Sequence, residues 1–260
     1  KEYPFLKEID SLALANVQLH LEKAYKNFFR DSKIGFPRFK SKHHSKNSYT
    51  TNVVNGNILV ESKRIRLPKL KWIAMKKHRE PAEGLRLKSV TVSMEPSGKY
   101  FASLLYEGYS CENQAAGPDY STAKILGIDY AMQGMAVFSE KVETEEAGFF
   151  RKNEKRLARE QRKLSRCVRG SHNYELQKKK VARCHEKIRN QRRDHLHKLS
   201  RKIADGYDAA AVEDIDMKAM GQCLHFGKSV QDNGYGMFRE MLDYKLAWQG
   251  KKMVKVDRFF

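Results

Sequence analysis

Apolar residues near the start of the chain recur at intervals of three and four positions. The members of this stripe are Leu14, Val17, Leu21, Ala24 and Phe28. Such spacing predicts an α-helix with one apolar face that packs on a core. Asp10 or Ser11 stands where this helix would begin, and either side chain is a favourable N-cap.

Between residues 47 and 107 the apolar positions fall in short runs that are typical of β-strands. Asn55-Gly56 predicts a tight hairpin turn between two such runs. Pro68 predicts an edge strand or a break, and a second hairpin is predicted around residues 95–98. The segment is therefore expected to be a small β domain of the barrel type, followed by a linker.

The second half of the chain alternates strand-like and helix-like patterns. The predicted elements are two strands joined by a short turn within 125–140, long helices within 149–203, a strand from 208, a helix at 235–249 and a strand at 252–257. Arg169-Gly170-Ser171 is expected to break the long helices in two. Since these helices separate the strand at 125 from the strand at 208, the two strands can be parallel neighbours.

Three of the predicted strands end in an acidic residue, namely Asp129, Glu213 and Asp257. Parallel neighbours bring their carboxyl ends to one edge of a sheet, so Asp129 and Glu213 are expected to lie side by side. Adjacent carboxylates repel each other, and a hard divalent cation commonly keeps both ionised. Acids at strand ends are also common without a metal, so the pattern alone leaves a structural role open.

Charge narrows the choice of partner. The 260 residues contain 51 Lys and Arg against 31 Asp and Glu, a formal net charge of +20 with a pI near 9.7. Residues 151–202 hold about 20 of the basic residues against about five acidic ones. A solvated helical hairpin is the alternative, but such a hairpin would usually balance its charges through i,i+4 pairs. A polyanion lying across these helices would relieve their repulsion, and acids with Mg²⁺ beside basic helices suit phosphodiester cleavage.

The cysteine pattern argues against other classes of protein. Cys111, Cys167, Cys184 and Cys223 lie far apart and form no CxxC pair, so neither a zinc site within the chain nor a disulfide framework is expected. No apolar run has the length of a membrane span, and no secretory signal is visible. These features favour a reducing cytoplasm.

Several stretches match known motifs in one consistent order: ILGIDYAMQGMAVFS, VEDIDMKAM, DNGYGMF and VKVDRFF. They resemble the TnpB family, transposon-encoded RNA-guided nucleases related to type V CRISPR effectors. The first stretch is similar to the family's first RuvC motif and the second to its second RuvC motif. The resemblance implies that Asp129 is a metal-binding aspartate, that Glu213 is a catalytic glutamate, and that Mg²⁺ is the cofactor.

The resemblance also implies a domain organisation. FLKEID and AYKNFF resemble the end of the family's helical recognition region, and KSVTVSMEPSGKYFASLLYE resembles its wedge β-barrel. The implied fold is α/β plus β-barrel, with a RuvC/RNase H-like mixed sheet that carries a basic helical insertion. The implied boundaries are 1–33 for the recognition region, 34–110 for the wedge domain, 111–122 for a linker and 123–260 for the RuvC-like domain, with basic helices at about 149–203.

The family pattern continues beyond Phe260 through a zinc ribbon to a third RuvC aspartate. The RuvC-like domain is therefore expected to be incomplete, Zn²⁺ is expected only if such a ribbon exists, and a chain ending at Phe260 is expected to bind RNA without cutting DNA. By the same resemblance Asp257 is interpreted as structural. Ala131 stands where the family more often has glycine.

The implied function is that of an RNA-guided DNA endonuclease in a bacterial or archaeal cytoplasm. Its partners would be a guide RNA from the transposon end and double-stranded target DNA beside a short motif, with no membrane and no small-molecule substrate. A cleavage-deficient guided repressor is one alternative, and a nonspecific RNA-binding or structural protein is another. The residues predicted to contact nucleic acid are Arg38, Lys40, Lys42, Tyr49, Thr50, Lys163, Arg166, Lys179, Arg189 and Arg192.

Overall fold

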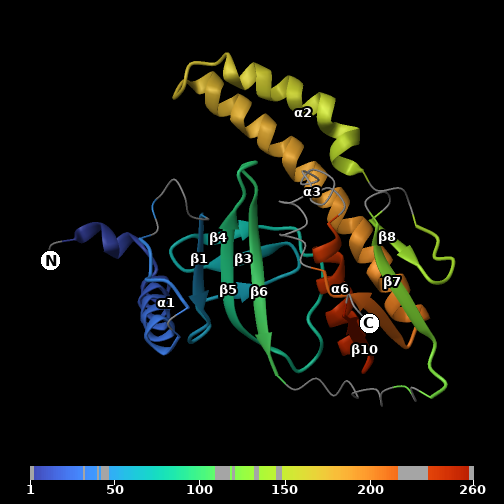
Figure 1. Cartoon of the computed structure of the whole chain (residues 1–260). Coiled ribbons are helices and arrows are strands. Elements are labelled where there is room, and N and C mark those ends of the chain that lie inside the picture. Colours follow the sequence, from blue (N-terminus) through green and yellow to red (C-terminus); the bar gives the residue numbers. More distant parts are fainter. Residues whose placement is uncertain are drawn as a thin grey trace. The chain divides into compact units, whose positions relative to one another are not determined.

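The chain folds into two compact units, Lys1–Cys111 and Glu112–Phe260. Figure 1 shows the computed structural model with its helices and strands labelled. The structure describes residues 3–31, 33–39, 41, 47–108, 118, 121–131, 135–144, 148–215 and 234–257. In this part of the chain no helix is both long enough and apolar enough to cross a membrane.

The first unit begins with a short 3-10 helix, η1, and the predicted helix, α1. Its elements are η1 (Pro4–Glu8), α1 (Ser11–Arg30), β1 (Asn47–Asn52), β2 (Leu59–Val60), β3 (Arg64–Leu67), β4 (Lys71–Ala74), β5 (Arg86–Met94) and β6 (Tyr100–Glu107). Asp10 is the N-cap of α1, since its carboxylate accepts a hydrogen bond of 3.2 Å from the backbone N–H of Leu12. The predicted helix and cap are therefore confirmed.

The buried face of α1 differs from the predicted one. Ala13 and Asn16 are buried, whereas Val17 and Leu21 are 63% and 54% exposed. The Asn16 amide donates to the backbone oxygen of Thr50 on β1 at 3.0 Å. This polar contact turns Asn16 toward the strand, and Val17 therefore lies outside the contact.

The β domain consists of two three-stranded sheets, with orders β1-β5-β6 and β2-β3-β4. They share a core of Ile58, Ile65, Leu67 and Val90. In the described residues no strand pairing joins the two sheets, and the barrel stays a prediction. The hairpin around 95–98 is confirmed, because β5 and β6 pair antiparallel across it.

The turn at Asn55-Gly56 forms but joins different partners from those predicted. Both residues have positive φ, 49° and 68°, as a tight turn of this sequence requires. However, β1 before it pairs with β5, while β2 after it pairs with β3. The turn thus connects two sheets and not two strands of one hairpin.

The second unit contains a four-stranded mixed sheet, and its strand and helix order agrees with the predicted α/β pattern. Its elements are β7 (Ile125–Ala131), β8 (Met135–Phe138), α2 (Phe149–Ser165), α3 (His172–Gly206), β9 (Ala209–Glu213), α6 (Tyr235–Trp248) and β10 (Lys252–Val256). The strand order is β10-β9-β7-β8. Strands β7, β9 and β10 run parallel, and β8 pairs antiparallel with β7 at the edge.

One face of this sheet packs on α3 and α6. Leu126 and Ile128 of β7 join Leu196 and Ile203 of α3 and Phe238 of α6 in a single buried cluster. Side chains on a strand alternate between the two faces, so the residues between the core positions point the other way. Ile125 on β7, Val137 on β8 and Val254 on β10 are accordingly 50%, 60% and 51% exposed.

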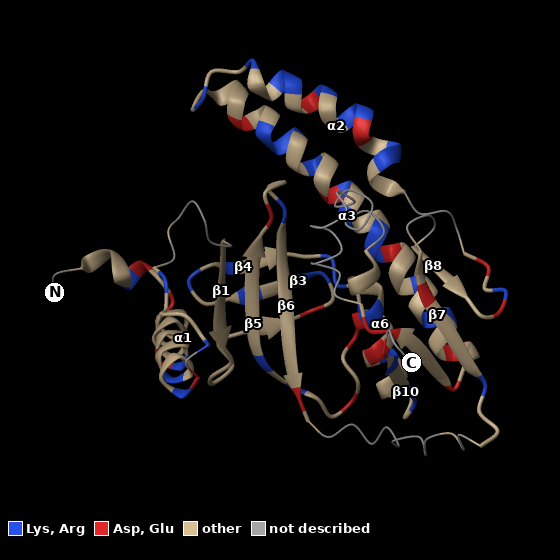
Figure 2. Ribbon diagram, viewed as in Figure 1, with Lys and Arg blue, Asp and Glu red and all other residues tan. Residues whose placement is uncertain are grey.

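Helices α2 and α3 form a long basic hairpin (Figure 2). Gly170, with a φ of 81°, lies in the loop between them, and the Ser171 side chain caps α3 by accepting from the backbone N–H of Tyr174 at 3.2 Å. The predicted break at Arg169-Gly170-Ser171 is therefore confirmed. Leu157 on α2 and Ile188 on α3 are buried, each 4% exposed.

Candidate active site and nucleic-acid interface

Strands β7 and β9 carry the two predicted site acids. Ile128 of β7 is in register with Val212 of β9, and both residues are buried in the core. Asp129 and Glu213 each follow one position later, so the alternation of a strand turns both away from that core. Asp129 is exposed and Glu213 is half-buried.

The structure brings these two acids to one cavity of about 400 Å³. Its lining residues are Gly127, Ile128, Asp129, Val137, Phe138, Ser139, Ala211, Val212, Glu213 and Val256. A side chain at Gly127 would be crowded, because a Cβ there would meet the Cβ of Ser139 at 3.3 Å. Glycine at this position avoids crowding against Ser139 in the cavity that Asp129 lines.

Asp214, the acid that follows Glu213, has two cationic neighbours. Asp214 accepts from Arg239 at 3.2 Å and lies 3.7 Å from the ammonium of Lys255. Its charge is therefore already balanced by two cations. Asp257 follows β10 at the same edge, since Val256 is in register with Glu213; its interpretation as structural stays a prediction.

Tyr235, the first residue of α6, interacts electrostatically with the carboxylates of Asp129 and Glu213. Burial raises the pKa of its phenol to about 12, while Arg239 opposes this and the carboxylates of Asp129 and Glu213 add to it. Its hydroxyl is buried without a hydrogen-bond partner among the described residues. Tyr235 lies in the matched stretch DNGYGMF, but the sequence predicts no role for it, because its proximity to the acids depends on how α6 packs on the sheet.

A divalent metal fits this pair as a partial ligand set. In the described ranges no cluster of three or more His, Cys, Asp or Glu side chains is arranged to hold a metal ion. Mg²⁺ usually keeps several waters and is commonly bound through one or two carboxylates together with substrate phosphates. Asp129 and Glu213 would be the residues that hold it.

Five predicted nucleic-acid contacts lie on the basic hairpin: Lys163, Arg166, Lys179, Arg189 and Arg192. The first four side chains are exposed and Arg192 is half-buried. Of these, only Lys163 lines a cavity between α2 and α3, described below. Their contact with nucleic acid stays a prediction.

The other predicted contacts belong to the first unit. Arg38 is exposed, and Lys40 and Lys42 lie outside the described residues. Tyr49 is half-buried, and burial, followed by the nearby Asp10 carboxylate, raises the pKa of its phenol. The Thr50 hydroxyl is 2.8 Å from the hydroxyl of Thr91 on β5, which gives it a structural partner within the sheet.

Known proteins are similar to this chain over nearly its whole length. A family model described as "Probable transposase" matches residues 108–223, a segment that includes both site acids. The "Putative RNA-guided DNA endonuclease InsQ" of Escherichia coli strain K12 is 32% identical over 98% of this chain. A "Putative RNA-guided DNA endonuclease" of Streptomyces pristinaespiralis is 31% identical over 100% of it. The chain belongs to the TnpB family.

This TnpB-family chain spans 64% of the length of the first relative and 63% of the second. The solved structure titled "Cryo-EM structure of the Cas12f1-sgRNA-target DNA complex" is similar over 89% of this chain and 58% of that one, with a TM-score of 0.48 and 14% identity. Within the TnpB-family chain, the matched segment 108–223 contains β7, the basic hairpin and β9.

Proposed function

We propose that this chain is the catalytic part of an RNA-guided DNA endonuclease with a RuvC-type site. The observation that carries the proposal is the parallel pairing of β7 and β9, which puts Asp129 and Glu213 at one cavity. The names of the two relatives point to the same activity. In this proposal the unit Glu112–Phe260 is the RuvC-like domain, and Lys1–Cys111 holds the wedge-type β domain and the end of the recognition region.

Asp129 and Glu213 would supply carboxylate oxygens to Mg²⁺. When bound, the metal would stabilise the charge that develops on the scissile phosphate and would activate the attacking water. The exposure of Asp129 leaves room for a nucleic-acid backbone to reach the pair. The core side chains Ile128 and Val212 hold the two strands in register, which fixes the spacing of the acids.

The partners in this proposal are a guide RNA from the transposon end and a duplex DNA target beside a short motif. A formal net charge of +20 and the basic hairpin support a polyanionic partner. Pairing between guide and target would read the sequence, and the protein would bind backbone phosphates and sugars.

The test is a cleavage assay with the full-length protein, the RNA that copurifies with it, a matching duplex and Mg²⁺. Asp129→Ala and Glu213→Ala are each expected to reduce cleavage below detection while guided DNA binding stays within about twofold of the unchanged protein, since neither acid supplies backbone affinity. Asp243→Ala removes an exposed acid of α6 that lies outside the cavity and serves as the control. Full cleavage by both site variants would exclude these acids from the chemistry.

A guided repressor without cleavage is the second candidate. The observation that favours it is the absence of a third metal ligand beside the pair in the described residues. In the same assay a repressor would bind the matching duplex without cutting it at any Mg²⁺ concentration. Cleavage by the unchanged protein decides in favour of the nuclease.

A further inference from the structure

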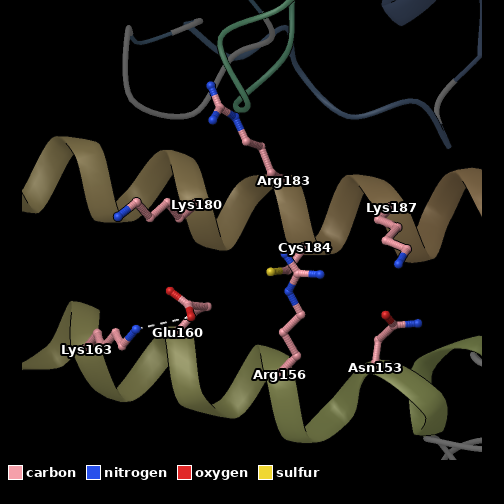
Figure 3. Close-up of a pocket in the computed structure, with 8 residues that line it drawn as sticks. All are labelled: Asn153, Arg156, Glu160, Lys163, Lys180, Arg183, Cys184 and Lys187. Carbon is pink, nitrogen blue, oxygen red and sulfur yellow. Dashed lines mark hydrogen bonds and ion pairs between the residues drawn. The ribbon is translucent and has the colours of Figure 1, made fainter.

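Helices α2 and α3 enclose a cavity of about 310 Å³ that lies apart from the acid pair (Figure 3). Its lining residues are Asn153, Arg156, Glu160, Lys163, Lys180, Arg183, Cys184 and Lys187. The members from α3 are spaced by three, four and seven positions, which places them on one face of that helix. Five of the eight lining side chains are basic and one is acidic.

Most of these basic side chains form no ion pair within the described residues. Lys163 lies 3.4 Å from the carboxylate of Glu160. In the described part of the chain Arg156 and Lys187 form no ion pair, and the same holds for Lys180 and Arg183. Like charges close to one another repel, and an anion placed between them would attract each of them.

A buried hydrogen-bond network sets the spacing of the two helices at this cavity. Gln177 of α3 donates to the Glu160 carboxylate at 2.8 Å and to the backbone oxygen of Glu160 at 3.0 Å. Glu160 and Gln177 are only 9% and 7% exposed. The hydrogen bond from Gln177, helped by Lys163 and Arg159, lowers the pKa of Glu160, so its negative charge stays at this end of the cavity.

The opposite end of the cavity is therefore the place for an anion. Figure 3 shows Arg156 extending from α2 toward α3 and Lys187 extending from α3 toward α2, with Asn153 beneath Lys187. Arg183 points away from α2 in the same view. A guanidinium can bind two oxygens of one phosphate, and an ammonium acts on it as a point charge.

We propose that this cavity binds a single backbone phosphate of a nucleic acid, held by Arg156 and Lys187. The proposal deepens the proposed function, on which it rests for the choice of nucleic acid as the partner. The phosphate belongs to the guide RNA or to the target DNA, and both offer the same phosphodiester chemistry. Lys163 stays with Glu160 at the other end of the cavity. Glu160 with Gln177 keeps the helices at the separation that the phosphate needs.

The experiment compares two double variants that lose the same charge. The cavity variant, Arg156→Gln with Lys187→Gln, removes the two cations that are proposed to hold the phosphate. Lys155→Gln with Lys178→Gln removes two exposed lysines of the same helices that do not line the cavity. Binding of a single-stranded RNA and of a duplex DNA of equal length is measured for each protein over a series of salt concentrations, without Mg²⁺.

The cavity variant is expected to lose about tenfold or more in affinity for one of the two ligands, as two charge-assisted contacts are removed. Its slope of log affinity against log salt should become flatter by about 0.9 for duplex DNA or about 0.7 for RNA, the value for one phosphate. The ligand that shows both changes is the source of the phosphate. The control variant should keep its slope.

Equal losses and equal slopes in the two double variants would overturn the cavity site. A charge-preserving variant, Arg156→Lys with Lys187→Arg, guards against a loss that comes from misfolding, since it should keep the slope of the unchanged protein. Cleavage is a separate readout. If Asp129→Ala still cuts DNA while the cavity variant shows its specific loss, the proposed catalytic site fails and the phosphate site stands.

Discussion

At the scale of single residues, Asp214 is an acid whose charge already has partners in the protein. Asp214, the neighbour of Glu213 in the sequence, is paired with Arg239, whose side chain is only 13% exposed. An acid that already has a cation nearby gains less from a metal than it would without that cation. The sequence VED does not reveal the two cations beside Asp214, and the structure does.

Gln177 gives a prediction about pH at the same scale. Its hydrogen bond is the main cause that lowers the pKa of Glu160 below the ordinary value of 4.5. A group whose folded pKa is lowered stabilises the fold above its unfolded pKa and loses that contribution as the pH falls through its folded pKa. Gln177→Leu is therefore expected to destabilise the protein most at neutral pH, and its effect should shrink under acidic conditions.

The free energy of unfolding in urea is measured for the unchanged protein and for Gln177→Leu, at neutral pH and at several pH values below 4.5. A part of the loss is independent of pH, because Gln177 also donates to the backbone oxygen of Glu160. Glu175→Leu is the control, since Glu175 is an exposed acid of the first turn of α3 outside the cavity. A difference that stays constant from neutral to acidic pH would contradict the assigned cause of the pKa shift.

At the scale of elements, α6 connects the site to the core. Phe238 is fully buried in the cluster that joins α3, α6 and the sheet, whereas Trp248 at the end of the same helix is 74% exposed. Phe238→Ala is expected to cost about 3–5 kcal/mol in the free energy of unfolding, because the lost burial leaves a cavity. Trp248→Ala should change it by only about 0.5 kcal/mol. Urea unfolding measures both, and similar losses would show that α6 packs differently.

The elements themselves follow from local chemistry, and that is why the sequence predicts them. Gly170 turns the loop between α2 and α3 through its positive φ, and the side chain of Ser171 caps α3. Asn55-Gly56 likewise makes its turn from its own φ angles. Which strands pair across that turn depends on residues far apart in the chain, such as Thr51 with Val90, and no local pattern contains that information.

The same distinction applies to the candidate sites. The placement of Asp129 and Glu213 at one edge of the sheet could be predicted, because a parallel crossover brings strand ends to the same edge whatever the details of packing. The cavity between α2 and α3 could not, because it depends on the register of two helices that Gln177 and Glu160 set. The sequence offers only a weak signal for it, since Glu160 is one of two acids in the basic run of α2.

At the scale of the whole molecule, internal ion pairs do not account for the basic excess. The pairs that do form, such as Lys198–Asp194 and Arg201–Asp205, lie mostly at exposed positions. Pairs of that kind contribute about 0–1 kcal/mol each. The 51 Lys and Arg therefore outnumber the 31 Asp and Glu, and this positive charge attracts anionic partners.

This surplus gives a prediction about salt for the complete complex with nucleic acid. Each phosphate that the protein neutralises releases counterions, and contacts to six to ten phosphates would lower the affinity by about 10³–10⁵ between 50 and 200 mM salt. Binding of the matching duplex by the protein with its copurified RNA measures this decline, with Asp129→Ala used so that cleavage does not consume the DNA. Returning the sample to low salt should restore the affinity, which controls for aggregation. A nearly flat salt dependence would mean that the basic residues do not lie on the backbone, and it would remove the main support for a nucleic-acid partner.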